Sequence, residues 1–159
     1  MAKIKIHNLF STPDQALITI RVEERKVEYL PPILYAFREE GISIPFIVQS
    51  IDRNGNFNQS LAIARKDLDW VKAAFQEGLD LAQPPAIEIR KEVALITLYG
   101  PHFGEIPGIA SRIFSALAVD AVEILALSAS FNSSLLVVPL ELLSQTLRSL
   151  NRIFEIPPK

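Results

Sequence analysis

A unit that occurs twice constrains this chain more than any other feature of its sequence. The first copy reads LPPILYAFREEGISIPFIVQS over residues 30–50, and the second reads ASRIFSALAVDAVEILALSAS over residues 110–130. A shift of 80 positions brings similar residues into register: Ile33 with Ile113, Leu34 with Phe114, Ala36 with Ala116, Phe37 with Leu117, Ile44 with Ile124 and Ser50 with Ser130. Solenoid repeats are shorter, at roughly 20–50 residues. The repeat therefore predicts two copies of one small α+β fold, with function where the copies meet.

The composition favours a folded protein without strong charge. Hydrophobic residues make up 49% and charged residues 21% of the 159 residues, which is typical of a chain with a buried core. The net charge is −2 and Lys and Arg form no cluster, so we expect no nucleic-acid partner. The absence of cysteine excludes disulfides, thiol catalysis and cysteine-based metal sites.

Neither end of the chain carries a signal for export or membrane insertion. The N-terminal stretch MAKIKIHNLF is too short and too polar for a signal peptide. The longest apolar run, LLVVPLELL, is interrupted by Pro139 and Glu141 and is far shorter than a membrane span. These features predict a soluble cytoplasmic protein with no membrane partner.

Residues 16–90 contain the predicted order β-α-β-β-α-β. The elements are a strand at 16–22, a helix from Leu30 stopped by Gly41, a strand at 42–51 with an edge or bulge at Pro45, a turn at 52–56, a strand at 58–64, a helix at 68–79 ended by Pro84 and Pro85, and a strand at 86–90. Pro31 and Pro32 fit the first helix only within its first turn. This order is that of a ferredoxin-like fold.

The second copy repeats the order but lacks its last strand. Its elements are a strand at 93–99, a helix at 107–118, a hairpin of 122–130 and 133–138 around Phe131-Asn132, and a helix at 143–154. The strand at 4–9, followed by a turn at 11–14, has no place in the first copy. We expect it to cover the edge that the missing strand would leave open in the second copy. A loosely attached N-terminus is the alternative.

These inferences define the expected domains. The first module covers residues 14–91, and the second consists of residues 1–12 plus 92–159. The fold class is α+β, with two ferredoxin-like βαββαβ modules, antiparallel sheets and helices on one face, and the first module inserted in the second.

An ordered series of motifs resembles the tandem ACT domains in the C-terminal regulatory region of aspartate kinase (aspartokinase). Asp14-Gln15-Ala16 followed by ITIRV is similar to the family's D-Q-A-x-I-T-I, and GISIPFIVQS to its G-I-N-V-D-M-I-V-Q. LYGPHFGEIPGIASRIFSALA resembles the family's VVGxGMxxxPGvAaxxFxALA, and EILALSASF stands where the family has N-I-x-M-I-S-T-S-E. No glycine-rich phosphate-binding motif of a kinase domain accompanies them. The resemblance implies a free-standing regulatory module without the kinase domain, unless a catalytic chain is supplied elsewhere.

The resemblance implies that a small amino-acid effector binds beside the turn between the first strand and first helix, at an interface between ACT modules. In the second module, Gly104, Pro107 and Gly108 match this turn, and His102 and Glu105 lie in the same loop. A helix N-terminus can hold the ligand's carboxylate. Alternatively, the glycines only allow a tight turn, and the two polar residues have no role.

The other candidate ligand-binding residues depart further from the family. Arg25, Lys26 and Val27 stand where the family has Asp-x-Pro-Gly, which either suits a more acidic ligand or forms a solvated turn. Gln49 matches the family's I-V-Q, and Glu123 and Ile124 its N-I, with Glu123 a possible acceptor for a cationic group. Ser128 and Ser130 match hydroxyls of its S-T-S stretch. Each of these positions is also explained by packing or by exposure to solvent.

Two function hypotheses follow. The first is a regulatory protein that binds an amino acid and biases its own assembly or a partner enzyme of amino-acid metabolism. The second is a dimerisation or docking module that has lost its ligand. No catalytic constellation and no metal site is evident, so we expect no enzyme activity and no cofactor. We also expect a homodimer, because Phe46 and Val48 would form an exposed apolar strand face.

Overall fold

The structure is a computed structural model that describes residues 2–23, 26–77, 79, 85–101 and 103–156. The chain divides into two compact units. Unit 1 consists of Met1–Pro13 and Val93–Lys159, and unit 2 of Asp14–Glu92. Two long strands, β2 (Asn8–Val22) and β5 (Ala86–Tyr99), contribute residues to both units.

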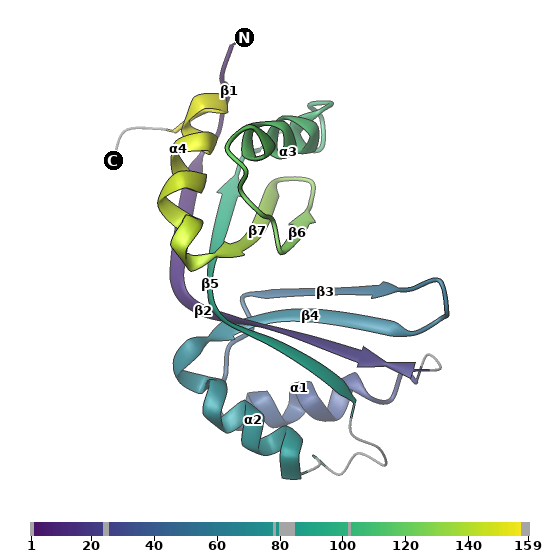
Figure 1. Ribbon diagram of the computed structural model, residues 1–159. Helices are drawn as coiled ribbons and strands as arrows, with labels where there is room; N and C mark the ends of the chain where they lie inside the picture. The colour runs from purple at the N-terminus through teal and green to yellow at the C-terminus, as the bar shows by residue number, and fades with distance from the viewer. Residues whose placement is uncertain (1, 24–25, 78, 80–84, 102, 157–159) are drawn as a thin grey trace. The chain divides into compact units, whose positions relative to one another are not determined.

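Unit 2 contains two helices and four strand segments. After residues 14–22 of β2 come α1 (Leu30–Glu39), β3 (Phe46–Ile51), β4 (Phe57–Ala64), a 3-10 turn η2 (Arg65–Asp67), α2 (Leu68–Glu77) and residues 86–92 of β5. Within the unit the strand order is β3-β4-β2-β5, and β2 and β3 are both antiparallel to β4. In Figure 1, α1 and α2 lie together on one side of this sheet.

Alternation along the strands of unit 2 explains where its core lies. Ala16, Ile18 and Ile20 lie at every second position of β2 and are buried on one face of the strand; Leu17, on the other face, is also buried, so both faces are covered there. The first three cluster with Ile33 and Phe37 of α1. Other members of the same core come from β4 and α2: Leu61, Ile63, Leu68, Val71 and Phe75. Each helix therefore places its apolar stripe on the same face of the sheet.

From β5 onward, unit 1 has a strand-helix-strand-strand-helix succession like that of unit 2, and it also contains N-terminal strand segments. Its parts are β1 (Ile4–Lys5), residues 8–13 of β2, residues 93–99 of β5, α3 (Ile109–Val119), β6 (Ala126–Ala129), β7 (Ser133–Pro139), a 3-10 turn η3 (Leu140–Leu142), α4 (Leu143–Ile153) and β8 (Phe154–Glu155). Within the unit the strand order is β2-β5-β7-β6, with β7 antiparallel to β5 and β6. A separate two-stranded parallel pair joins β1 to β8.

The core of unit 1 also lies between its sheet and its helices. Ala94, Ile96 and Leu98 alternate along β5 and cluster with Ile113 and Leu117 of α3. Leu136 and Val138 of β7, and Leu150 and Phe154 at the end of the chain, complete the fully buried set. The main-chain N–H of His7 donates to the carbonyl of Tyr99 over 2.8 Å, which ties the N-terminal segment to the end of β5.

The helices begin and end close to the predicted positions. Pro31 and Pro32 do lie in the first turn of α1, where their missing N–H groups cost no intrahelical bond. Gly41 follows the end of α1 with φ of 69°, a left-handed conformation that glycine adopts at little cost. Helix α2 ends at Glu77. Pro84, one of the two prolines predicted to end this helix, lies outside the described part of the chain.

Three local predictions were wrong. Residues 11–14 form no turn but continue strand β2, with Asp14 in a left-handed conformation at φ of 57°. The strands expected at 86–90 and 93–99 are one continuous strand, β5. Strand β3 begins at Phe46 rather than at residue 42, because the preceding Pro45 has no N–H to donate to the sheet.

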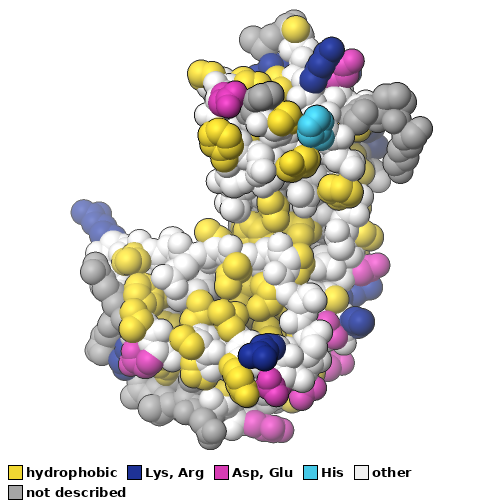
Figure 2. All heavy atoms as spheres, turned by 180° about the vertical axis from the view of Figure 1, so that it is seen from behind, with side chains coloured by type: hydrophobic (Ala, Val, Ile, Leu, Met, Phe, Trp, Pro, Cys, Tyr) yellow, Lys and Arg dark blue, Asp and Glu magenta, His cyan; other side chains and the backbone are white. Residues whose placement is uncertain are grey.

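The expected exposed face of Phe46 and Val48 also needs correction. Phe46 is only 2% exposed, and Val48 is half-buried. The exposed hydrophobic residues of β3 are Ile47 and Ile51, which point to the opposite face of the strand. On the face shown in Figure 2, hydrophobic side chains are interspersed with charged ones of both signs.

Candidate functional site

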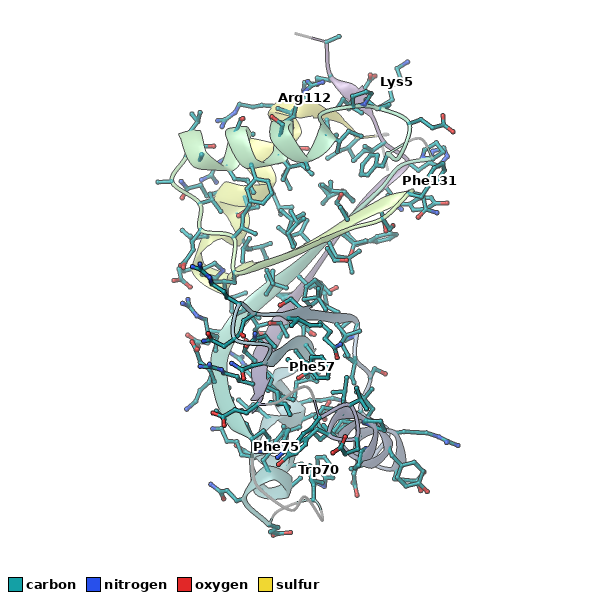
Figure 3. All side chains as sticks on the ribbon, turned by 90° about the vertical axis from the view of Figure 1, so that its right-hand side faces the viewer. Lys5, Phe57, Trp70, Phe75, Arg112 and Phe131 are labelled. Atoms are coloured by element: carbon teal, nitrogen blue, oxygen red, sulfur yellow. The ribbon has the colours of Figure 1, made fainter. Side chains whose placement is uncertain are left out.

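The loop between β5 and α3 in unit 1 is held against the hairpin turn that joins β6 to β7. The N–H of Gly100 donates to the carbonyl of Asn132 over 2.8 Å, and that of Gly104 donates to the carbonyl of Phe131 over 2.7 Å. Figure 3 shows Phe131 at this end of unit 1. These two backbone hydrogen bonds, one before and one after Pro101 in the sequence, hold the loop against the hairpin turn.

Gly100 and Gly104 are both places where the loop comes close to an aromatic ring. A Cβ atom at Gly100 would lie 2.5 Å from the ring of Phe103, which is buried and stacked on Phe154. A Cβ atom at Gly104 would meet the ring of Phe131, which is 64% exposed. Glycine is therefore required sterically at Gly100, and at Gly104 it allows Phe131 to lie over the loop.

Helix α3 starts at the end of this loop without a side-chain cap. Gly108 is its N-cap residue, with φ of 85°, and its carbonyl accepts the first intrahelical bond from Arg112 N over 2.9 Å. Among the described residues, no side chain caps the helix, and its first turn contains no acidic residue. Pro107, Gly108 and Ala110 are exposed. The N–H groups of the first turn carry the positive end of the helix dipole and can bind a carboxylate or another small anion.

The serine candidates lie on or near the hairpin turn. The hydroxyl of Ser130 lies 2.8 Å from that of Ser133 and 3.4 Å from the Asn132 side-chain oxygen, so it already has partners within the turn. Ser128 is half-buried in β6. Because Asn132 also accepts the bond from Gly100, the Ser130 turn is part of the support for the loop.

The remaining candidates in unit 1 are not brought together with Gly108. Glu123 and Ile124 follow the C-terminal end of α3, about 16 Å from its start at the usual rise per residue of an 11-residue helix. Ile124 is half-buried and packs against the core, whereas Glu123 is exposed. Glu105 is exposed in the loop. His102 lies outside the described residues.

The corresponding region of unit 2 differs in its chemistry. Val27 is 71% exposed in the segment before α1, Lys26 is half-buried there, and Arg25 lies outside the described residues. The prolines in the first turn of α1 remove N–H donors that the start of α3 retains. The N-terminus of α1 is therefore a poorer anion site than that of α3.

Gln49 lies in β3 beside a second amide. The Gln59 Nε2 atom donates to the Gln49 Oε1 atom over 3.0 Å, and Gln59 is 1% exposed. Sequence reasoning missed Gln59, although its alternation with Leu61 and Ile63 places it on the helix-facing side of β4. The register places Gln49 opposite Gln59, which in turn pairs with Ile20 near the end of β2.

Asp52 organises the β3–β4 turn of unit 2. Its carboxylate accepts bonds from Asn54 N at 2.8 Å, Asn56 N at 3.0 Å and Asn56 Nδ2 at 2.9 Å. Chiefly because of the side-chain and backbone bonds from Asn56, the pKa of Asp52 is lowered from 3.8 to about 2. The Asp52 carboxylate therefore has a structural role, as the hydrogen-bond acceptor that holds the turn. Within the described residues, no group of three or more His, Asp or Glu side chains could hold a metal ion.

Part of this chain matches a family model, and most of it is similar in sequence to curated proteins. Residues 88–152 match the family model described as ACT domain. Curated relatives include aspartokinase of Helicobacter pylori, 24% identical over 143 residues that cover 90% of this chain, and aspartokinase of Bacillus sp., 24% identical over 127 residues that cover 80%. The chain spans 35% and 31% of the length of these relatives.

Solved structures share the fold over nearly the whole chain. The ligand-free regulatory subunit of aspartate kinase from Thermus thermophilus has a TM-score of 0.82 and 17% identity, covering 94% of this chain and 99% of that one. Aspartate kinase of Clostridium acetobutylicum has a TM-score of 0.81 and 21% identity, covering 98% of this chain and 36% of that one. Residues 88–152 thus resemble an ACT domain, and the chain has the α+β fold of aspartate kinase regulatory regions. In the described part, no helix is long and apolar enough to span a membrane.

Proposed function

We propose that this protein is a tandem ACT-domain regulatory protein that binds a free amino acid. Both units would be ACT modules, with unit 2 inserted in the chain of unit 1. The shared order of strands and helices supports this assignment, as does the pair of backbone bonds at the end of each first helix. The likeness in fold to a separate regulatory subunit of aspartate kinase supports a regulatory rather than a catalytic role.

The uncapped start of α3 carries the proposal. An α-carboxylate placed there would receive N–H groups that no side chain caps, while Gly108 leaves the approach free of a side chain. Apart from its chain neighbours, no atom of the described residues lies within 4 Å of the place where a Cβ of Gly108 would be. The expected ligand is therefore a small zwitterion whose carboxylate faces the helix.

A structural role is the second candidate, and the start of α1 favours it for unit 2. With prolines in its first turn and the exposed Val27 before it, this unit lacks the features that we assign to ligand binding in unit 1. Unit 2 would then dimerise or dock onto an enzyme of amino-acid metabolism, while unit 1 senses the ligand. Such a ligand changes assembly only if it binds two states with different affinity.

A thermal-shift screen with the twenty amino acids tests ligand binding. A ligand at 100 times its dissociation constant should stabilise the fold by about 2.7 kcal/mol. Gly108→Asp and Gly108→Asn form a matched pair, because both residues tolerate a left-handed conformation and differ mainly in charge. We expect Gly108→Asp to abolish the shift, since its carboxylate occupies the helix start and repels the ligand, and Gly108→Asn to retain more of it.

Two results would contradict the proposal. The absence of a shift with any amino acid would reject amino-acid binding and favour the dimerisation module. An equal shift in wild-type protein and Gly108→Asp would reject the start of α3 as the binding site, because the ligand would then bind elsewhere. For the proposed homodimer, size-exclusion chromatography with light scattering at micromolar concentration should give twice the 17.7 kDa chain mass, and a clean monomer would exclude the dimer.

A further inference from the structure

A groove on unit 2 lies between α1 and α2. Its volume is about 570 Å³, which is within the usual size range of small-molecule sites. Three alanines, Ala36, Ala73 and Ala74, are among its lining residues. Their small side chains leave room between the two helices, whose larger apolar residues point toward the sheet.

Two aromatic side chains also line the groove. Tyr35 of α1 is 59% exposed, so most of its ring is not packed against the fold. Trp70 of α2 is half-buried and meets Phe37 edge-on, with ring centroids 6.0 Å apart. Figure 3 shows Trp70 on the α1 side of α2. The contact with Phe37 holds the indole in place while the rest of it borders the groove.

Glu77 is the one charged side chain among the described lining residues, and it is exposed at the end of α2. A groove lined by a carboxylate and by aromatic rings attracts a cation in two ways, by the charge of the carboxylate and through the negative faces of the rings. An anionic ligand would be repelled by Glu77, and a neutral apolar ligand would leave the carboxylate unused. The lining residues therefore favour a ligand that carries a positive charge on an otherwise apolar molecule.

We propose that this groove binds an alkylated ammonium ion, with its methyl or methylene groups against Tyr35 and Trp70 and its charge near Glu77. This site is distinct from the start of α3 and does not depend on the amino-acid site. Its ligand needs no carboxylate, which separates it chemically from the zwitterion expected in unit 1.

The fluorescence of Trp70 reports on this site directly, because Trp70 is the only tryptophan of the chain. The probe is choline chloride, and its neutral isostere 3,3-dimethyl-1-butanol is the matched ligand control. Sodium chloride keeps the ionic strength constant. We expect choline to change the emission of Trp70 saturably, and the neutral isostere to bind about tenfold more weakly because it lacks the cationic attraction.

Variants assign the effect to the groove. Glu77→Gln should weaken choline binding about tenfold, and Tyr35→Leu should weaken it several-fold, through loss of charge and of an aromatic face respectively. Glu39→Gln removes an equal charge from α1 outside the lining and should leave binding unchanged. Circular dichroism checks that each variant is folded.

Three outcomes would overturn the proposal. The first is the absence of a saturable change in Trp70 emission up to about 50 mM choline, well above millimolar affinity. The second is equal binding of choline and its neutral isostere, and the third is equal choline binding by wild-type protein and folded Glu77→Gln. Either of the last two would show that the groove does not select a cation.

Discussion

Gly41 and Ala121 occupy equivalent positions after the C-terminal ends of α1 and α3, and both have a left-handed backbone conformation. Their φ angles are 69° and 52°. Gly41 N donates to Arg38 O, and Ala121 N to Ala118 O; the residue after each donates to Phe37 O and Leu117 O. The same pair of bonds thus recurs 80 positions later, but only the first copy has the residue that adopts this conformation without strain.

Exchanging these residue types should shift stability in opposite directions. Ala121→Gly should raise the free energy of unfolding by about 1 kcal/mol, because it relieves left-handed strain that exceeds the added entropy of the unfolded chain. Gly41→Ala should lower it by a similar amount, although the space around Gly41 would admit a Cβ atom. Urea unfolding of the two variants measures both changes. If Ala121→Gly leaves the free energy of unfolding unchanged or lowers it, the backbone at Ala121 is not strained.

Substitution by alanine should reduce stability by different amounts at Gly100 and Gly104 of the β5–α3 loop. At Gly100, the new methyl group meets Phe103, whose ring is buried and stacked on Phe154, so we expect a loss of about 1–3 kcal/mol. At Gly104, it meets the exposed ring of Phe131, which can turn into solvent, so the loss should be smaller. Thermal unfolding compares the two. Equal losses would show that Phe131 is as fixed as Phe103.

Asp52 should make stability depend on pH. Because the folded state lowers its pKa from 3.8 to about 2, the folded state binds fewer protons than the unfolded state between these values. The stabilisation is therefore complete above about pH 5 and is lost as the pH falls through about 2. Asp52→Asn lacks this contribution, so the difference in unfolding free energy between wild type and variant should shrink as the pH falls. A difference that is constant with pH would contradict this assignment.

Asp120 provides a test of which neighbour controls a carboxylate. It lies after α3, where it accepts bonds from the Ser149 hydroxyl and the Arg152 guanidinium; the bond from Ser149, and then the bond and the charge of Arg152, lower its pKa. We expect both Ser149→Ala and Arg152→Met to raise the pKa of Asp120, because each removes a group that stabilises the charged carboxylate. NMR titration of the side-chain carboxyl carbon would measure both. A variant that leaves the pKa of Asp120 unchanged would show that the substituted residue does not control this carboxylate.

Local sequence signals predicted much of the fold, but not its long-range pairings. Gly41 indicated the end of α1, and Asp52 to Asn56 indicated the hairpin turn, because glycine and asparagine favour these conformations locally. Ala121 gave no such signal, since alanine is the best helix former. The turn expected at 11–14 is a strand in which Asp14 accepts a 3.1 Å bond from the distant Arg65. Composition alone does not reveal that partner.

The candidate site was only partly predictable for the same reason. Pro107 and Gly108 could be read as a helix start from their own residue types. The contacts of Gly100 with Asn132 and of Gly104 with Phe131 depend on how β6 and β7 return to the loop. Tyr35 and Trp70 lie on different helices, so no spacing within either helix shows that they border one groove.

The most direct test of the proposed function follows the main-chain amides at the start of α3 by NMR. Each of the twenty amino acids is titrated into isotope-labelled protein, and the amide signals of Ile109 and Ala110 are monitored. The account predicts that at least one amino acid shifts these two signals saturably, and that Gly108→Asp abolishes the change. If no amino acid shifts them, or if the shifts persist in folded Gly108→Asp, the start of α3 is not an amino-acid site.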